Sequence, residues 1–205
     1  MKRFFFALLL VILTVALLVL CWAASVGRLA LPEAMPWPFA TVTLPADYPA
    51  RPADLPRADV VRVVDGDTVV VTVDGAEARV RLLGINAPET RDPRRPVQCF
   101  GFQSSEAAKA LMAGERVWLE ADPSQSNYDR YDRLLRYLWL DDGRMVNLEL
   151  ISLGVASEYT YDGPYRYQDT FTQAEAVARR GEVGLWSPAT CKGRFDSAVV
   201  PTPSP

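Results

Sequence analysis

The 205-residue sequence contains no histidine. This absence excludes every hydrolytic mechanism in which a histidine serves as general base, as nucleophile or as metal ligand. Among the remaining side chains, a carboxylate is the natural proton acceptor near neutral pH. Any general base in this protein is therefore expected to be an aspartate or a glutamate.

The sequence is also poor in lysine and has no excess of positive charge. Its 22 basic residues are 19 arginines and three lysines, and with 25 acidic residues the formal net charge is −3. Between positions 58 and 190 there are 15 basic and 21 acidic residues, which gives a net charge of −6. An acidic domain is not attracted to a polyanion by its overall field. Binding a polyanion would need local arginines or a bound cation.

Cysteine is scarce, and its placement agrees with export. Cys21 belongs to an apolar N-terminal segment, which leaves only Cys99 and Cys191 in the rest of the chain. Two thiols in an oxidising compartment can pair, and a bond between them would close a loop worth about 4–5 kcal/mol in the chain-entropy model. Two unpaired thiols are the alternative, and the sequence does not decide between them.

The N-terminus carries the one long hydrophobic run. After Lys2 and Arg3 the chain has no charge from Phe4 to Ala24, and about 20 such residues suffice to span a bilayer. We expect residues 1–25 to be an N-terminal hydrophobic helix that anchors the protein to the membrane, or a leader that is cleaved. Basic residues before the span favour a cytoplasmic N-terminus. Both interpretations place the rest of the chain outside the cytoplasm, anchored or secreted.

Proline marks the limits of the compact domain. Residues 26–57 are rich in proline and lack periodicity, which predicts an extended linker. Residues 191–205 end in "VVPTPSP" and are predicted to be a tail. The intervening residues 58–190 contain no internal repeat and are expected to form one domain.

The hydrophobic pattern of that domain predicts a mainly β fold with helices. Alternating and β-branched runs bounded by turn residues indicate five strands, and three segments with helical spacing each end at a glycine. The expected fold is a five-stranded Greek-key barrel, the OB-fold, with three helices. The strands are expected at 60–64, 68–73, 78–83, 116–121 and 133–140, and the helices at 100–114, 145–154 and 167–181.

One stretch, "VVDGDTVVV" at residues 63–71, places Asp65 and Asp67 around Gly66 between two β-branched runs. An Asp-Gly pair in such a setting is a strong hairpin signal, because glycine tolerates the positive φ of tight turns. The same two carboxylates could instead hold a cation. Taken alone, this stretch favours the turn.

Five motifs change that interpretation. "DGDT", "RLLGINAPET", "DRYDRLLRY", "MVNLELISLGVA" and "GLWS" follow one another between residues 60 and 187. In order and spacing they resemble the staphylococcal nuclease (thermonuclease) family. The resemblance implies a calcium-dependent phosphodiesterase that acts on DNA or RNA, leaves 3′-phosphate ends and has its active site at one end of the barrel. It is also expected to act as a monomer.

The resemblance assigns roles by position. The catalytic residues would be Arg81 and Arg133, which grip the phosphate, and Glu89, which positions or activates water. Calcium would be bound by the Asp67 carboxylate and the Ala87 carbonyl, with Asp65 in support of the turn. Physically, two arginine forks match phosphate oxygens, and a hard cation adds further positive charge.

The remaining assignments concern the nucleotide pocket and one departure from the family pattern. Tyr131, Tyr159 and Tyr161 would line the pocket for the base, although packing beneath a loop explains them equally well. Asn86 stands where the family commonly has a second metal-binding aspartate. An amide oxygen can bind calcium but brings no charge, so we expect weaker calcium binding than in a two-aspartate relative.

Two other classes of function remain open. A degenerate domain of the same family could bind nucleic acid or protein without cleavage, and Asn86 favours that alternative. A barrel that binds saccharides at the cell envelope is a second alternative, but it has no need of two arginines beside a metal carboxylate.

Overall fold

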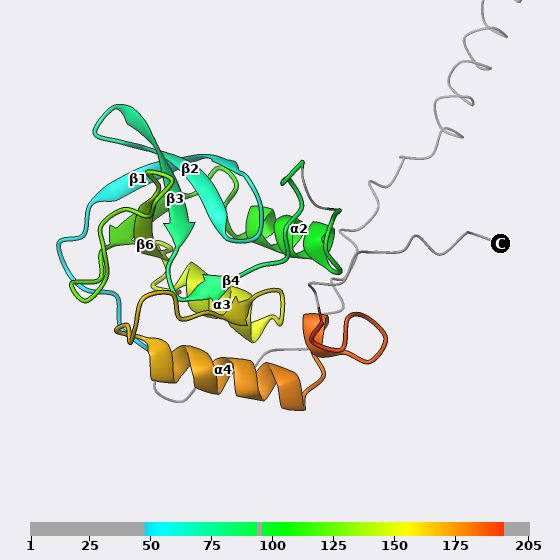
Figure 1. Cartoon of the computed structure of the whole chain (residues 1–205). Coiled ribbons are helices and arrows are strands. Elements are labelled where there is room, and N and C mark those ends of the chain that lie inside the picture. The colour runs from blue at the N-terminus through cyan, green and yellow to red at the C-terminus, as the bar shows by residue number, and fades with distance from the viewer. Residues whose placement is uncertain (1–47, 94–95, 195–205) are drawn as a thin grey trace, which may run out of the picture. The chain divides into compact units, whose positions relative to one another are not determined.

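The protein's structure, a computed structural model, describes residues 48–93 and 96–194 (Figure 1). The predicted N-terminal hydrophobic helix, most of the predicted linker and most of the predicted tail lie outside the described residues. Within the described part of the chain, no helix is long and apolar enough to cross a membrane.

Five strands close into a barrel in the order β1-β2-β3-β6-β5. Four of the strand pairs are antiparallel, and β3 runs parallel to β6. Closure leaves these five strands without an open edge, and the barrel agrees with the predicted OB-fold. The strands are β1 (Arg57–Val63), β2 (Thr68–Val73), β3 (Ala76–Leu82), β5 (Arg116–Glu120) and β6 (Leu134–Trp139).

Valine-rich sequence explains the central strands. Val69, Val71 and Val80 are fully buried, and β-branched side chains pack well on a pleated surface. Between β2 and β3, Asp74 and Gly75 have φ of 51° and 79°. This two-residue turn has the left-handed backbone that the Asp-Gly pair predicts.

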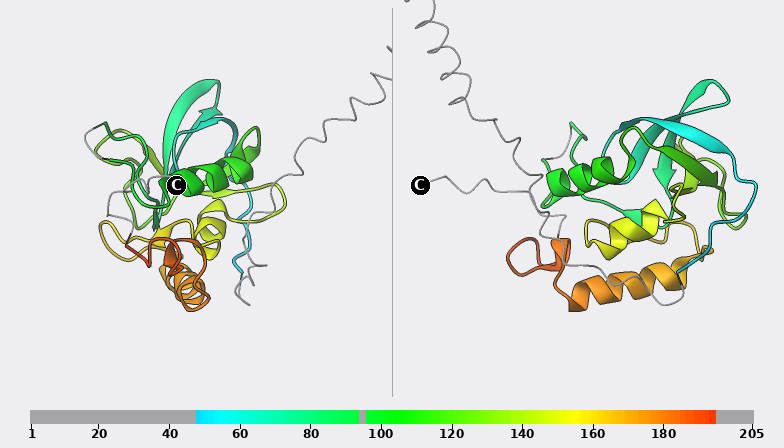
Figure 2. Two further views of the ribbon diagram at one scale, coloured as in Figure 1. Left: turned by 90° about the vertical axis from the view of Figure 1, so that its right-hand side faces the viewer. Right: turned by 180° about the vertical axis from the view of Figure 1, so that it is seen from behind.

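Three helices accompany the barrel: α2 (Gly101–Met112), α3 (Val146–Ser152) and α4 (Gln168–Arg180). The views in Figures 1 and 2 show α3 between the barrel and α4, with α2 beside the barrel. All seven residues of α3 are buried, as expected for a helix covered on both sides. The five predicted strands and three predicted helices are confirmed to within a few residues at each end.

Three short elements were not predicted. The strands β4 (Ile85–Asn86) and β7 (Ser157–Glu158) pair with each other, and η1 (Gly184–Trp186) is a turn of 3₁₀ helix. Two-residue strands carry no periodicity, so a pattern cannot reveal them. Their pairing fixes Asn86 opposite Ser157.

The chain contacts the core of the domain from Tyr48 onward. The Tyr48 hydroxyl donates to Glu149 Oε1 at 3.0 Å and accepts from the Met145 N–H at 2.6 Å. Leu55 also packs against the core cluster. The described end of the proline-rich segment therefore lies against α3 and the residue before it.

A disulfide joins Cys99 and Cys191, whose Cα atoms are 5.9 Å apart. Cys99 comes just before α2, and Cys191 follows η1. The bond therefore links the loop that precedes α2 to the C-terminal end of the described chain.

Gly66 is a glycine for a reason other than the one the sequence suggested. Its φ is not positive, unlike that of most described glycines. A Cβ at this position would lie 2.5 Å from the Cβ of Ala87 and 3.1 Å from that of Ser104. Close packing of the β1–β2 loop against α2 and the residue after β4 therefore excludes a side chain here.

We expect Gly66→Ala to lower the free energy of unfolding by about 1–3 kcal/mol, because overpacking forces neighbours to move. Urea unfolding followed by fluorescence measures the effect. In a Gly66→Ala/Ala87→Gly double variant, the closest Cβ contact is gone, so its loss should be smaller than the sum of the two single losses. Additive losses, or a Gly66→Ala variant as stable as the wild type, would contradict this account.

Candidate functional site

Three strand ends meet at one end of the barrel. Thr68, the first residue of β2, lies opposite Arg81 near the end of β3, and Arg81 lies beside Leu135 near the start of β6. The end of β3 pairs with the start of β2 in antiparallel fashion, and the register of β3 and β6 pairs that same end with the start of β6, so these positions share one rim. Asp67 and Arg133, which precede β2 and β6, are thereby brought next to Arg81.

The Asp67 carboxylate is buried and has three partners. Its Oδ2 accepts from the Ala87 N–H at 2.9 Å and lies 3.1 Å from Arg81 Nη2. Its Oδ1 accepts from the Thr68 hydroxyl at 3.0 Å. A buried charge needs such compensation, and it holds the β1–β2 loop against the residues that follow β4.

Arg81 points to the same place. Its Nη1 donates to the carbonyls of Leu82 and Ile85, both at 2.8 Å, which ties down the turn between β3 and β4. Its Nη2 lies 3.5 Å from Asn86 Oδ1, in addition to the contact with Asp67. The guanidinium therefore lies between the carboxylate of Asp67 and the amide oxygen of Asn86.

Asp65 turns the loop toward these residues. Its Oδ1 accepts from the Asp67 N–H at 3.1 Å, an Asx turn. Burial, together with the negative charges of Asp67 and Glu89, raises the pKa of Asp65 to about 7. The carboxylate of Asp65 is thus close enough to those of Asp67 and Glu89 to be repelled by both.

Glu89 is held by the chain that follows it. Its Oε1 accepts hydrogen bonds from the N–H groups of Thr90, Arg91 and Asp92, at 2.8, 2.6 and 3.1 Å. Its own N–H donates to Gln98 Oε1 at 2.6 Å. Among the described residues, its second oxygen, Oε2, has no hydrogen-bond partner.

Arg133 is oriented by Asp129, a residue that the sequence analysis did not single out. Asp129 Oδ2 lies 2.6 Å from both Nε and Nη2 of Arg133. Asp129 Oδ1 accepts from the N–H groups of Tyr131 and Arg133, at 2.9 and 3.0 Å. The sequence "DRYDR" places an acidic and a basic residue four positions apart. This spacing predicts an ion pair only when the conformation of the loop is known.

Thr68 is a second residue that was missed. Its hydroxyl donates to Asp67 Oδ1 at 3.0 Å and lies 3.4 Å from Arg133 Nη1. Its side chain connects the carboxylate side of the site to the second arginine. Thr68 is the last residue of the motif "DGDT", but the sequence analysis assigned no role to its side chain.

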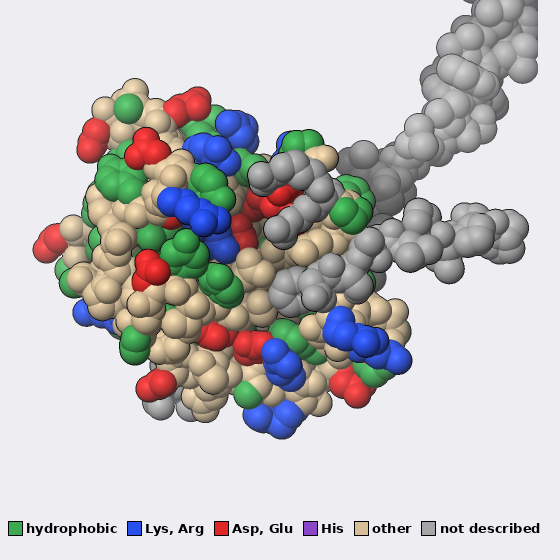
Figure 3. Space-filling model, in the orientation of Figure 1, with side chains coloured by type: hydrophobic (Ala, Val, Ile, Leu, Met, Phe, Trp, Pro, Cys, Tyr) green, Lys and Arg blue, Asp and Glu red, His purple; other side chains and the backbone are tan. Residues whose placement is uncertain are grey.

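A cavity of about 500 Å³ opens beside the two arginines. Figure 3 shows basic and acidic side chains next to one another near the middle of the face that it presents. Four exposed tyrosines line the cavity, of which Tyr128 was not predicted. Six of the residues that the sequence analysis assigned to the site also line the cavity: Arg81, Asn86, Tyr131, Arg133, Tyr159 and Tyr161.

The other predicted residues lie outside the lining of this cavity. Asp67 and Ala87 are buried and contact each other, and Glu89 is half-buried on the loop that follows them. Asp67 does not line the cavity but contacts Arg81, which does. The roles assigned to all of these residues remain predictions.

The side-chain oxygens of Asp67 and Asn86 are of the types that a hard cation binds. Within residues 48–93 and 96–194, no three Cys, Asp or Glu side chains form a group that could hold a metal ion on their own. The donors are mixed: Asp67 Oδ2 and Asn86 Oδ1 both face the positively charged Nη2 of Arg81. Carboxylate, amide and backbone carbonyl oxygens are the ligands that calcium takes in proteins.

Comparison with known proteins identifies the same family that the five sequence motifs resemble. The sequence model of the family described as "Staphylococcal nuclease homologue" matches residues 79–188. The thermonuclease of Staphylococcus hyicus is 38% identical over 128 residues, which cover 62% of this chain and 74% of that protein. The SPbeta prophage-derived endonuclease YokF of Bacillus subtilis (strain 168) is 37% identical over 127 residues, 62% of this chain and 42% of that protein.

The Asp129–Arg133 contact predicts a pH-dependent loss of stability. Burial by itself would raise the pKa of Asp129, but the hydrogen bonds and charge of Arg133 outweigh it and lower that pKa. A lowered carboxyl pKa stabilises the fold above the unfolded value, and the contribution is lost as the pH falls through the folded value. Asp129→Asn should therefore cost about 1–3 kcal/mol at neutral pH and progressively less below about pH 4.

Urea unfolding at pH 7 and at pH 3 tests this expectation. Asp132→Asn is the matched control, since Asp132 is exposed in the same loop. An equal loss for Asp129→Asn at both pH values would show that its charge is not what stabilises the loop.

Proposed function

This chain belongs to the staphylococcal nuclease homologue family, and we propose that it is a nuclease that hydrolyses phosphodiester bonds of DNA, RNA or both. The observation that carries the proposal is the convergence of Arg81, Arg133 and Asp67 on one rim of the barrel. The thermonuclease and endonuclease names of its relatives support the same class of activity.

Two arginines are suited to a phosphodiester. The group is an anion, and attack by water adds negative charge around phosphorus. Guanidinium groups stay charged and match phosphate oxygens with paired N–H donors. Binding of a phosphate by Arg81 would exchange its contacts with Asp67 and Asn86 for contacts with the phosphate oxygens.

Glu89 is the group proposed to accept the proton of the attacking water or to orient that water. Three backbone N–H groups hold Oε1, and Oε2 has no partner among the described residues. Without histidine in the chain, no imidazole competes for this role. Expulsion of the 5′ oxygen would then leave a 3′-phosphate end.

Calcium is the proposed cofactor. Asp67, Asn86 and the Ala87 carbonyl would hold it, and the bound ion would supply positive charge that offsets the charge of the phosphate. The neutral Asn86 lowers the number of charged ligands, which predicts modest affinity.

The tyrosines of the cavity are proposed to bind the nucleotide next to the scissile phosphate. Tyr131, Tyr159 and Tyr161 are all exposed at its wall, and aromatic side chains stack on bases without regard to sequence. The site would therefore be tolerant of base identity.

We also propose that the nuclease works outside the cytoplasm, as a monomer. The Cys99–Cys191 disulfide supports this location, because such bonds persist in oxidising compartments. The hydrophobic residues near the N-terminus would serve as membrane anchor or as a cleaved leader.

Glu89→Gln should lower kcat for single-stranded DNA by about 10²- to 10⁴-fold, the usual contribution of a general base. Steady-state hydrolysis by the full chain, with calcium titrated against a chelator, measures this. Glu106→Gln, at an exposed position on α2, is the control and should leave kcat unchanged.

Binding of DNA without cleavage at any calcium concentration would contradict the nuclease proposal. It would favour a binding module of the same family, with Asn86 as the residue to change first. Cleavage that persists in Glu89→Gln would remove Glu89 from the proposed mechanism.

Asn86→Asp should tighten calcium binding by about tenfold or more, because it adds a charged ligand beside Asp67. Calorimetric titration measures the dissociation constant directly. Asn127→Asp adds the same charge at an exposed position that does not line the cavity, and it should have little effect. Equal affinity of Asn86→Asp and wild type would exclude this residue from the calcium site.

A further inference from the structure

Gln98 is hydrogen-bonded to both the N–H and the carbonyl of Glu89. Its side-chain Oε1 accepts from the Glu89 N–H at 2.6 Å, and its own N–H donates to the Glu89 carbonyl at 2.9 Å. One residue thus satisfies both main-chain polar groups of Glu89, as a neighbouring strand would. The position of the Glu89 backbone therefore depends on Gln98.

The Glu89 carboxylate follows its backbone. Among the described residues, the hydrogen bonds to its Oε1 come from the three N–H groups that directly follow it in the chain. A side chain held by its own following turn moves when that turn moves. Displacement of the Glu89 backbone would therefore move the carboxylate as well.

Gln98 is in turn held by its neighbours. Its carbonyl accepts from the N–H of Gly101 at 3.0 Å, where α2 begins. A Cβ on Gly101 would lie 2.6 Å from Cγ2 of Thr90 and 3.2 Å from the Glu89 carbonyl oxygen. The start of α2 is therefore pressed against the Glu89 loop, and Cys99, the residue after Gln98, is bonded to Cys191.

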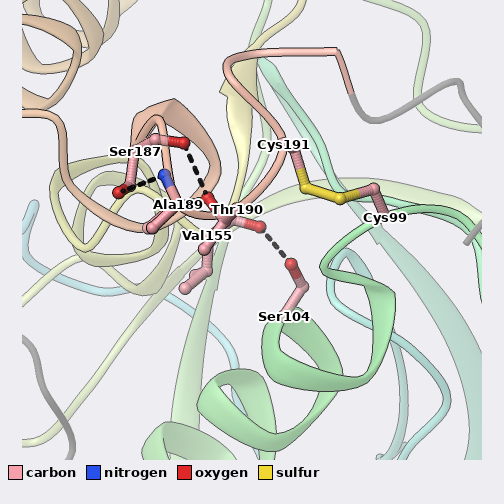
Figure 4. Close-up of a disulfide and its surroundings, with 8 residues drawn as sticks. Cys99, Ser104, Val155, Ser187, Ala189, Thr190 and Cys191 are labelled. Atoms are coloured by element: carbon pink, nitrogen blue, oxygen red, sulfur yellow. Dashed lines mark hydrogen bonds between the residues drawn. A yellow bond between two sulfur atoms is a disulfide. The ribbon is translucent and has the colours of Figure 1, made fainter. Parts of the chain in front are cut away.

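The far end of the disulfide is a well-anchored turn (Figure 4). Thr190 Oγ1 donates to the Gly184 carbonyl at 2.5 Å, and the Gly193 N–H donates to the Leu185 carbonyl at 2.8 Å. The Leu185 N–H donates to the carbonyl of Gly154, after α3, at 2.8 Å. Cys191 therefore connects Cys99 to a segment that is docked on the helical layer.

From these contacts we propose that Gln98 is a positioning residue for Glu89 and that the Cys99–Cys191 disulfide keeps Gln98 in place. The inference rests on the proposed function, in which Glu89 acts on water. Arg81 and Arg133 are held by the barrel and its loops, so loss of the Gln98 contacts should lower the rate of the chemical step and leave substrate binding intact.

Gln98→Leu, which lacks the acceptor oxygen, should lower kcat by about 10- to 100-fold with little change in KM. Gln98→Glu keeps an acceptor and should retain most of the activity. Gln103→Leu, at an exposed glutamine on α2, is the matched control. A Gln98→Leu variant with the kcat of the wild type would overturn the positioning role.

Amide hydrogen exchange at Glu89 provides a readout that needs neither calcium nor activity. Gln98→Leu should speed exchange of the Glu89 N–H by about tenfold or more, and Gln103→Leu should not. An inactive wild-type protein would refute the proposed function, whereas the exchange rates would still decide whether Gln98 holds Glu89. Unchanged exchange in Gln98→Leu would overturn the anchoring.

A Cys99→Ser/Cys191→Ser variant tests the disulfide. It should show the same loss of kcat as Gln98→Leu and the same faster exchange at Glu89, and addition of Gln98→Leu should lower kcat by less than about twofold more. Full kcat without the disulfide would overturn its role. Global unfolding would also overturn it, if it occurred both in this variant and in wild-type protein whose disulfide is reduced at low temperature. The bond would then stabilise the whole fold rather than the Glu89 loop.

Discussion

The contact between Asp67 and Arg81 is the interaction on which the site depends. The two charged groups lie 3.1 Å apart with side chains only 10% and 14% exposed, so each needs the other to offset the cost of leaving water. Asp67 also accepts from the Ala87 N–H, and Arg81 donates to two carbonyls of the following turn. The pair therefore fixes the relative positions of the β1–β2 loop, the end of β3 and the start of the Glu89 loop.

The proposed binding of an anion by a net-acidic domain would depend on local positive charge. Asp67 and Asp129 each pair with one arginine, and Thr68 lies between the two pairs. These carboxylates orient guanidinium groups that would otherwise sample many rotamers. Because the side chains are already ordered, less conformational entropy would be lost when a phosphate binds. An excess of acidic residues is thus compatible with two arginines held ready for a phosphate.

The C-terminal part of the domain supports the site from outside the barrel. The turn that carries Cys191 is hydrogen-bonded to η1, and η1 is hydrogen-bonded to Gly154, which follows α3. Its disulfide joins it to Cys99, beside the backbone partner of Glu89. The barrel holds the arginines, while the glutamate lies on a loop held by the helical layer. The two halves of the site therefore rest on different parts of the fold.

The sequence by itself determined the barrel, the three helices and the family, because β-branched runs, helical spacing and five ordered motifs are local signals. It also indicated which residues to examine at the site. Only the tertiary structure decided that close packing excludes a side chain at Gly66. It also decided that Thr68 and Asp129 contact Arg133 and that Gln98 accepts a hydrogen bond from the backbone of Glu89. Those features are contacts between segments distant in the chain or within irregular loops, and no periodicity in the sequence encodes such contacts.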